Sequence, residues 1–371
     1  MFEILLEQTF NFLSQEYADL FCRSNATAFQ HPLWLHNLYG KLVKKAAAEP
    51  LIVTVRSEVD HRLAMVLPLI RQRHGLVRTV EFADLGVSDY AEPVCDRETF
   101  LRIAQDKQAQ RQIRECLAPF DLIRIKKLRE NRLPLEELLI GAKAVPMDMS
   151  AHAVKLQPSF TEWRSTSMSR SYQKELDKKK RQLVRKGAYR FECSQDPDAI
   201  RAAFNSMREY RAPRFQNRDK GEGDLLQKPV FYDFYLELAL AGRNDFTRTY
   251  IMWLDDRPIA IALGLAHAKQ LLVVLGGFDL VGFKNQSVGA LMFEEVAGDC
   301  IARSDVVMDF TIGDEPYKQL YGAEASAMWT VSSAGSSIGS ISGFMVDRMP
   351  WIKDMAKRLL HKPRQTEAQP G

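Results

Sequence analysis

The stretch LLVVLGGFDLVGFKNQSVGALMFEEVAGDCIARSDVVMDF, residues 271–310, decides the fold. Apolar runs at 271–275 and 306–310 predict two buried strands. The glycine-containing segment 276–286 predicts the loop that follows the first strand. A helix is predicted from Ser287 to about Arg303, and its apolar face consists of Val288, Leu291, Met292, Val296 and Cys300. That spacing is typical of a helix packed on a sheet, so the stretch predicts an α/β (α+β) unit.

The start of this helix is a candidate anion site. Its first backbone amides and the positive end of the helix dipole would face an anion bound there. Glycine allows close approach of the backbone, and the glutamine and serine before it offer side-chain hydrogen bonds. We therefore predict a pyrophosphate site at Gln286, Ser287, Val288, Gly289 and Ala290. The alternative is an ordinary capped helix start.

Two similar pairs of apolar runs indicate an internal repeat. The first pair covers 51–55 and 63–70, and the second covers 250–254 and 259–266, about 200 residues later. A polar turn joins the runs of each pair, which predicts two hairpins. A duplicated α+β unit explains both hairpins, and chance recurrence of a common motif is the alternative.

The length of 371 residues exceeds what a single hydrophobic core usually serves. The stretch 128–158 holds three prolines and little sustained periodicity, so it predicts a short helix and a crossover between two units. We expect a first unit over 1–150, a second unit over 151–330, and a Ser/Gly loop with a basic tail over 331–371.

The composition is that of a globular protein, with 51 basic and 47 acidic side chains and 46% hydrophobic residues. The five cysteines are odd in number and at least 21 residues apart, which argues against a disulfide framework or a zinc cluster, and we expect no metal. The first 13 residues carry two glutamates and no basic leader, unlike a signal peptide. These features together predict a cytoplasmic protein.

Residues 325–346 carry no charge and include three glycines at four-residue intervals, so a membrane helix has to be considered. Seven serines make the segment too polar for a convincing span, and a final strand followed by a Ser/Gly loop is the favoured interpretation. The mixed apolar and basic residues at 344–359 indicate either an interfacial helix or a segment packed on its own domain. Peripheral membrane contact therefore stays open.

A helix predicted over 165–186 concentrates positive charge. It holds eight basic residues against two acidic ones, a net charge of +6, whereas the whole chain carries +4. This local excess points to an anionic partner, such as a nucleotide substrate, tRNA or an acidic membrane. A solvated helix face is the alternative.

The second half resembles the GNAT N-acyltransferase superfamily. The acyl-CoA pyrophosphate loop of that superfamily has the form Gln/Arg-x-x-Gly-x-Gly/Ala between a strand and a helix. Residues 286–289 match its first four positions, while Leu291 stands where the superfamily has a small residue. The resemblance implies that acyl-CoA, in the first place acetyl-CoA, is the donor substrate.

More closely, the chain resembles the BioF2-like, or CelD-like, acetyltransferase group associated with bacterial cellulose and exopolysaccharide biosynthesis. The stretches 82–93, 277–279, 284–289 and 309–318 carry this resemblance, which spans roughly residues 25–330. It implies a tandem GNAT-like fold with two mixed sheets flanked by helices, as in the Fem peptidoglycan aminoacyltransferases.

Acyl transfer to an amine requires a base for the amine and a proton for the leaving thiolate. Tyr317, at the start of a short helix, is our candidate acid, and Tyr321 is its rival. A tyrosine on a helix in this place often has that role in the superfamily; packing on the sheet end is the alternative. Asp309 and Glu315 are candidate bases, as is Asp314, although capping of the short helix would also explain the last two.

Five further residues are candidates for contact with the acceptor. Arg211 and Arg214 precede a polar loop that borders the acceptor site in the superfamily, and Lys318 could bind a phosphate or carboxylate. Asp89 and Tyr90 lie in a glycine-containing loop of the first unit that would complete the cleft. Salt bridges, a surface lysine and turn chemistry are the respective alternatives.

These expectations combine into one function. We expect an acyl-CoA-dependent N-acyltransferase, with acetyl-CoA as the first candidate donor, that transfers acyl groups other than aminoacyl groups to an amine of a sugar or sugar nucleotide in polysaccharide biosynthesis. A polysaccharide synthase would be its macromolecular partner. The alternatives are a Fem-like aminoacyl-tRNA-dependent transferase, and a non-catalytic accessory protein of the synthase.

Overall fold

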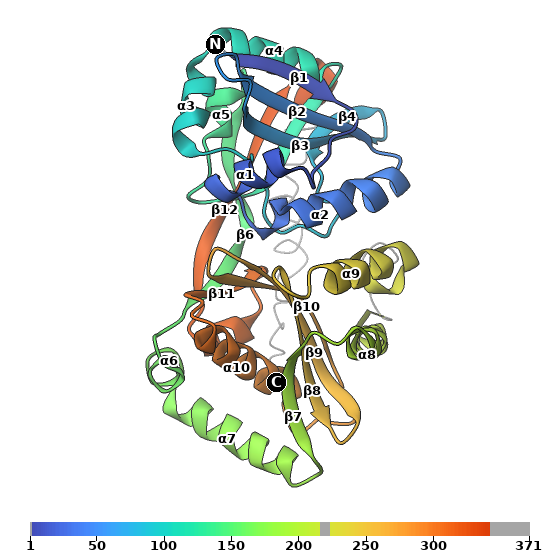
Figure 1. Cartoon of the computed structure of the whole chain (residues 1–371), viewed down its shortest axis with the longest axis vertical. Helices are drawn as coiled ribbons and strands as arrows, with labels where there is room; N and C mark the ends of the chain where they lie inside the picture. The colour runs from blue at the N-terminus through green and yellow to red at the C-terminus, as the bar shows by residue number, and fades with distance from the viewer. Residues whose placement is uncertain (1, 216–222, 342–371) are drawn as a thin grey trace, which may run out of the picture.

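The computed structural model describes residues 2–215 and 223–341, without the side chains of 214 and 215. Its described strands form one twelve-stranded mixed sheet in the order β1-β2-β3-β4-β5-β12-β6-β11-β10-β9-β8-β7 (Figure 1). The first half contains β1 (Phe2–Glu7), α1 (Gln15–Arg23), η1 (Ala28–Gln30), α2 (Pro32–Asn37), η2 (Leu38–Val43), β2 (Glu49–Ser57), β3 (Leu63–His74), β4 (Val77–Phe82), α3 (Arg97–Gln105), α4 (Lys107–Leu117), β5 (Leu122–Arg129), α5 (Leu135–Leu138) and β6 (Lys143–Lys155).

The second half contains α6 (Phe160–Ser167), α7 (Arg170–Val184), β7 (Tyr189–Ser194), α8 (Pro197–Phe215), η3 (Leu225–Gln227), α9 (Pro229–Ala241), β8 (Thr247–Leu254), β9 (Arg257–His267), β10 (Gln270–Phe278), α10 (Val288–Ala302), β11 (Val307–Ile312), η4 (Pro316–Tyr321) and β12 (Glu324–Ala334). The predicted strand–helix–strand succession is confirmed as β10, α10 and β11. Both predicted hairpins are confirmed as β2–β3 and β8–β9.

The same arrangement of strands occurs twice. In each half a hairpin is followed by a third antiparallel strand, then by a helical crossover, then by a parallel fourth strand. The two sets are β2-β3-β4-β5 and β8-β9-β10-β11. This recurrence supports the duplicated unit that the hairpins predicted.

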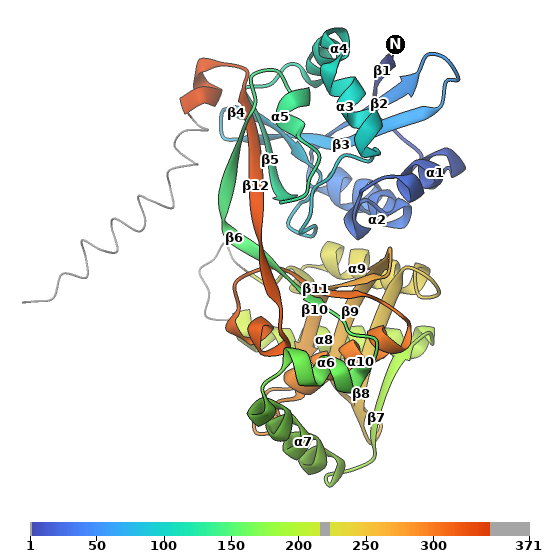
Figure 2. The same cartoon turned by 90° about the vertical axis from the view of Figure 1, so that its left-hand side faces the viewer.

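Two long strands join the halves. β6 pairs with β11 in the second half, and β12 pairs with both β6 and β5. Figure 2 shows β6 and β12 running side by side from one half to the other. The two mixed sheets expected from the sequence are therefore fused edge to edge into one. The expected boundary near residue 150 falls inside β6, and residues 331–334 of the expected loop belong to β12.

A shared apolar core also connects the halves. It includes Trp34 on α2 and Phe234 on α9, whose ring centroids lie 5.2 Å apart. Figure 1 shows α2 and α9 facing each other across the middle of the molecule. Both rings are fully buried, so the two halves are held by apolar packing as well as by strand pairing.

The predicted basic helix over 165–186 is two helices, α6 and α7. The chain breaks at Met168 because Ser169 takes an extended conformation and its side chain accepts a hydrogen bond from the Tyr172 amide, which caps α7. In the described part of the chain, no helix has the length and apolar character needed to cross a membrane. The segment 344–359 lies outside the described residues, as does the part of 325–346 beyond residue 341.

Candidate active site

The site begins where β10 and β11 part. The two parallel strands pair only from Gln270–Val307 to Leu272–Asp309. Beyond that point β10 carries a bulge after Val273, and β11 is irregular at Thr311, whose φ is 59°. Diverging strands leave the backbone groups on their facing edges available to a ligand.

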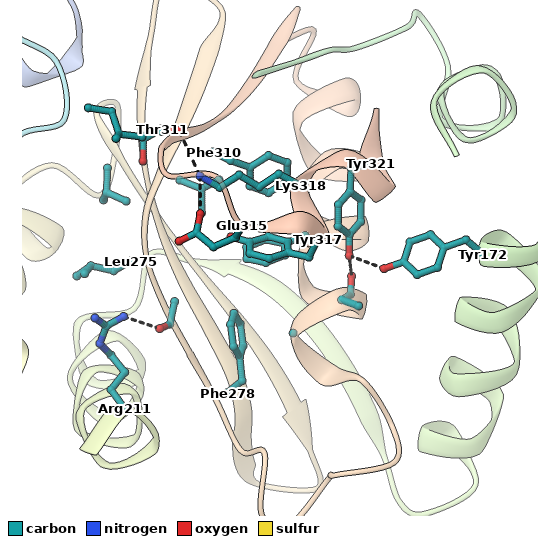
Figure 3. A pocket seen from close by; sticks show the side chains of 17 residues that line it. Tyr172, Arg211, Leu275, Phe278, Phe310, Thr311, Glu315, Tyr317, Lys318 and Tyr321 are labelled. Atoms are coloured by element: carbon teal, nitrogen blue, oxygen red, sulfur yellow. Dashed lines mark hydrogen bonds and ion pairs between the residues drawn. The ribbon is translucent and has the colours of Figure 1, made fainter. Parts of the chain in front are cut away.

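A groove of about 390 Å³ opens between the parted strands (Figure 3). Segments 273–276 of β10 and 310–312 of β11 form its two sides. Residues of α7, α8, α10 and η4, together with Phe278 and Glu315, line the rest, so the groove passes through the sheet plane between helices on both faces. It is large enough for an extended chain such as an acyl-pantetheine arm.

The corresponding place in the first half is filled. β4 and β5 pair only at Thr79–Leu122 and Val80–Ile123, and they part in the same way. There the loop 82–93 closes the gap, because the Ala91 amide donates to the Lys127 carbonyl at 2.9 Å and the Lys127 ammonium donates to the Ser88 carbonyl at 2.7 Å. Of the two repeated units, the second is therefore the one with an open groove of this kind in the described structure.

Aromatic side chains form the wall of the groove on the α10 side. The Tyr317 ring stacks on Phe293, with centroids 5.4 Å apart and ring planes 6° apart. Phe310 meets both rings edge-on, and Phe278 meets Phe293 in the same way. Tyr317 is 37% exposed and lines the groove, and its role as the acid stays a prediction. This wall can cover an apolar acyl chain or thioester while keeping a phenol beside it.

Tyr321, the rival acid, is fixed by hydrogen bonds. It is fully buried, its hydroxyl donates to the Ala290 carbonyl at 2.8 Å, and it receives a hydrogen bond from Tyr172 at 3.3 Å. Burial raises the pKa of Tyr321 well above its ordinary value. These contacts tie η4 to α10 and α7, and they make Tyr321 a poorer proton donor than an ordinary phenol.

Lys318 holds the turn between β11 and η4. Its ammonium contacts the Thr311 carbonyl at 3.3 Å, the Gly313 carbonyl at 2.8 Å and the Glu315 carboxylate at 3.0 Å. An ammonium has three donors, and three acceptors surround this one. Its side chain is 2% exposed, which corrects the surface lysine considered from the sequence. Glu315 and Lys318 both line the groove, but they hold each other.

Asp309 points away from the groove into a second cavity. Its carboxylate accepts hydrogen bonds from the Tyr90 hydroxyl at 2.8 Å and from the Thr311 amide at 2.7 Å. Burial raises the pKa of Asp309 to about 6, despite these donors and the charge of Arg129. Asp309 and Tyr90, predicted separately, are thus brought together from opposite halves of the chain.

Asp89 lies beside this pair, near the end of β11. Its carboxylate shares a hydrogen bond with Thr311 and lies 3.9 Å from the Lys127 ammonium. Burial raises the pKa of Asp89, while the positive charge of Lys127 opposes that shift. The loop 82–93 therefore docks on the end of β11 through two adjacent residues, and its role in the acceptor cleft stays a prediction.

Arg211 on α8 reaches the opposite side of the groove. Its guanidinium donates to the Gly276 carbonyl at 2.8 Å (Figure 3). It also donates to the Asp224 carboxylate at 2.8 to 3.1 Å. Asp224 is buried, so this pair holds the bulged part of β10 in place. Arg214 lies in the last turn of α8, and its side chain is outside the described part of the structure.

The start of α10 fits an anion through its backbone. Ser287 adopts a left-handed conformation with φ 53° and makes no side-chain cap, so the Val288 and Gly289 amides keep their donors, whereas the Ala290 and Leu291 amides donate to the Ser287 carbonyl. A Cβ on Gly289 would lie 3.1 Å from the Phe278 ring, a tight contact, so a larger residue there would have to displace that ring. Gly289 and Ala290 line the groove, whereas the Val288 side chain is core. Leu291 is also core, so its departure from the superfamily pattern does not obstruct the groove.

Sequence reasoning missed the aromatic wall and the partner of Arg211. Phe293 lies in the predicted helix but outside its predicted apolar face, and Phe278 follows two glycines at the strand end. An aromatic residue directly after a Gly-Gly pair at a strand end was the available signal for a close backbone approach.

Comparison with known protein families agrees with the position of the groove in the second half. Residues 170–319 match the family model of the acetyltransferase (GNAT) domain. That range contains the groove strands, the start of α10 and most of η4. The structure therefore has a GNAT-like fold, with a mixed sheet and flanking helices. No curated protein matches the chain.

Solved structures resemble nearly the whole chain in fold. FemX is 10% identical, with 88% of this chain and 96% of FemX covered at a TM-score of 0.59. The C-terminal domain of a putative lysylphosphatidylglycerol synthetase from Agrobacterium fabrum is 12% identical, with 90% and 95% covered at 0.55. L-PGS from Bacillus licheniformis is 10% identical, with 90% and 95% covered at 0.56. At such identities the likeness concerns the fold alone.

These neighbours correct one expectation. We expected transfer of acyl groups other than aminoacyl groups, but FemX and L-PGS are aminoacyl transferases. The restriction is therefore wrong: a fold of this kind accommodates aminoacyl transfer. The closer resemblance to the BioF2-like or CelD-like group stays a prediction, and the comparisons give no support to a role in cellulose or exopolysaccharide synthesis.

Proposed function

We propose that this protein is an acyltransferase whose thioester donor, an acyl-CoA, binds in the groove between β10 and β11. The observation that carries this proposal is the parting of the two strands directly before the uncapped start of α10. The strand edges would hydrogen-bond the pantetheine amides, and the first amides of α10 would receive the pyrophosphate. Gln286 and Ser287 border that start, and Gly289 leaves room for it.

Tyr317 would supply the proton for the leaving thiolate. It is exposed to the groove and held flat against Phe293, whereas Tyr321 is buried and already hydrogen-bonded. Glu315 would act through Lys318 on the shape of the turn rather than as a base, because the two are paired. The acceptor we propose is an amine of a sugar or sugar nucleotide, which rests on the resemblance to the BioF2-like group.

Thermal stability with and without millimolar acetyl-CoA tests this proposal. A ligand that binds only the folded state raises the melting temperature by mass action. We expect an increase of several degrees for the native chain and none for Gly289→Trp, since the indole would fill the space at the start of α10. Gly40→Trp is the matched control, because a side chain at Gly40 meets nothing within 4 Å. An unchanged melting temperature with acetyl-CoA and longer acyl-CoAs would contradict the proposal.

A second candidate, aminoacyl-tRNA-dependent transfer, is favoured by the charge on α7. Exposed basic side chains follow one another at intervals of three or four residues and fall within about 80° of the helix circumference. They are Arg170, Lys174, Lys178, Arg181 and Arg185. The stripe is about 22 Å long. Figure 1 shows α7 at the outer end of the second half.

Binding of tRNA at several salt concentrations separates the two candidates. Five phosphate contacts predict that the logarithm of the affinity falls with the logarithm of salt with a slope of about −4. The double variant Lys174→Glu/Lys178→Glu should weaken binding strongly, while Lys44→Glu/Lys45→Glu, which changes two exposed lysines of the first half, should not. Absence of salt-dependent tRNA binding would remove this candidate.

A further inference from the structure

A second cavity, of about 340 Å³, lies between the two halves. The first half contributes the segment 24–28, Tyr90 and Arg129, and the second half contributes the hairpin turn 267–270 and Asp309. Neither half forms this cavity alone. A cavity lined by residues of both repeats is a typical place for a ligand, because ligand sites lie preferentially between domains.

This cavity adjoins the groove at the last pair of residues that joins β10 to β11. Leu272 and Asp309 form that pair and line the cavity. The residues that follow them, Val273 and Phe310, line the groove. Successive side chains of a strand point to opposite faces of the sheet, and the groove crosses the sheet plane directly beyond this last pair, so ligands in the two spaces would meet through the gap between the parted strands.

Asp309 presents an acceptor to the cavity. The residue is 8% exposed, and its Oδ1 atom already accepts from the Thr311 amide. The single hydroxyl proton of Tyr90 lies between both carboxylate oxygens, each 2.8 Å from the hydroxyl oxygen. Since each carboxylate oxygen has about two lone pairs, Oδ2 retains capacity for an N–H group of a ligand.

Arg129 is the other charged residue of the cavity wall. Its Nη2 atom donates to the Asn25 carbonyl at 3.0 Å, and its guanidinium carbon lies 5.8 Å from the centre of the Tyr90 ring. Its Nε atom is buried and has no hydrogen-bond partner among the described residues. Arg129 and Asp309 both face this cavity, and each is held by other contacts. One positive and one negative group in a single space suit a ligand that carries both charges.

We infer that this cavity binds the acyl acceptor, and that the acceptor carries a primary amine, received by Asp309, and a separate phosphate or carboxylate, received by Arg129. The inference rests on the proposed function. In the transfer step the bound ammonium first releases one proton to solvent; the neutral amine nitrogen then forms a bond to the acyl carbon and loses a second proton to Asp309. The carbon–sulfur bond breaks, and the thiolate takes the hydroxyl proton of Tyr317; solvent then restores both side chains.

Calorimetric titration of the full chain with three matched sugars tests the two-charge requirement. Glucosamine 6-phosphate has the amine and the phosphate, glucosamine has only the amine, and glucose 6-phosphate has only the phosphate. We expect the first to bind at least about tenfold more tightly than either of the others, because each added charged contact contributes more than about 1.4 kcal/mol. L-Alanine serves as a smaller second probe of the same class.

Variants of Arg129 and Asp309 test which side chain binds the phosphate and which binds the amine. Arg129→Met should reduce glucosamine 6-phosphate binding to that of glucosamine, and Asp309→Asn should reduce it to that of glucose 6-phosphate. Arg129→Lys, which keeps the charge, should retain part of the preference for the phosphate even if Arg129→Met folds poorly. Arg111→Met changes an exposed arginine on α4 and should leave all three affinities unchanged.

The outcomes separate this inference from the proposed function. Failure of both glucosamine 6-phosphate and L-alanine to bind at millimolar concentration overturns the inference, as does equal binding of glucosamine 6-phosphate to Arg129→Met and the native chain. Each variant should keep the stabilisation by acetyl-CoA. If the charged sugar binds while acetyl-CoA has no effect, the acceptor cavity is supported and the acyl-CoA donor is wrong.

Discussion

At the scale of single residues, Tyr317 and Tyr321 show how position within one short helix changes the chemistry of a side chain. They lie four residues apart in η4. Tyr317 is partly exposed beside the groove, and Tyr321 is buried against α10. Desolvation disfavours the charged phenolate, so burial raises the pKa of Tyr321 above that of an ordinary phenol. A variant of Tyr317 is therefore tested by the rate of acyl transfer, and a variant of Tyr321 by the free energy of unfolding.

We predict that Tyr317→Phe lowers the rate of acyl transfer by about a hundredfold, the usual contribution of a general acid. Affinity for acetyl-CoA should stay within a factor of two or so, because the stacked ring is kept. Tyr321→Phe is the matched control: it should cost about 1 kcal/mol of unfolding free energy through its lost hydrogen bonds. Equal rates for Tyr317→Phe and the native chain would remove Tyr317 from the mechanism.

Asp309 gives a pH dependence of stability. Burial raises its pKa to about 6 in the folded chain, above its ordinary value of 3.8. The folded state therefore binds the proton more tightly than the unfolded state, and the resulting stability is present below pH 4 and lost as the pH rises through 6. Relative to Asp309→Asn, the native chain should lose up to about 3 kcal/mol of unfolding free energy between pH 4 and pH 7.

Denaturant unfolding of the native chain and of Asp309→Asn at several pH values measures this difference. Groups that do not interact with Asp309 titrate alike in the two proteins, so their contributions cancel, whereas the measured difference includes the interaction of Asp309 with its charged neighbour Asp89. A constant difference in unfolding free energy across the pH range would mean that Asp309 keeps its ordinary pKa.

At the scale of elements, the edge of β10 is held open by α8. Arg211 connects the Gly276 carbonyl on the bulged strand to the buried carboxylate of Asp224. The carboxylate has side-chain exposure of 1%, so it depends on this partner. Removing one member of a buried ion pair leaves the other charge uncompensated.

Arg211→Met should therefore lower the free energy of unfolding by about 3 kcal/mol. Lys155→Met removes an exposed ion pair with Glu324, in which both side chains are at least 70% exposed, and should cost less than about 0.5 kcal/mol. Chemical denaturation compares the two variants. Similar small losses for both would show that the contact between Arg211 and Asp224 does not support the groove.

Local patterns predicted the elements of the site, and distant partners decided its details. β10, α10 and β11 follow one another in the chain, and their periodicity is sufficient to predict them. The burial of Lys318 depends on a turn that folds back on itself between β11 and η4. The position of Asp309 depends on Tyr90, which is 219 residues away in the sequence. Contacts of that range leave no periodic signal in a single sequence.

At the scale of the whole molecule, β12 makes the two repeats interdependent. It returns from the second half to pair with β5, and Val331 on this strand is fully buried in the core of the first half. The prediction of two sheets followed from the resemblance to a tandem GNAT-like fold, whereas their fusion depends on β6 and β12, which lie far apart in the sequence. Shared strands and a shared core should make the chain unfold as one unit.

Val331→Ala should therefore lower the single melting transition of the whole chain, with a loss of about 1 to 3 kcal/mol from the cavity it leaves. Val306→Ala, at a half-exposed position, is the control and should have little effect. Differential scanning calorimetry distinguishes the alternatives. Two transitions, of which only one shifts, would contradict the interdependence of the halves.

The central claim is that the parted strands β10 and β11 receive the acyl donor. Backbone amide hydrogen exchange with and without acetyl-CoA tests it most directly, because it reports which backbone groups become protected. We predict slower exchange in segments 273–278, 288–291 and 310–312, and unchanged exchange in the filled counterpart between β4 and β5. Protection elsewhere, or none in these three segments at saturating acetyl-CoA, would contradict the account.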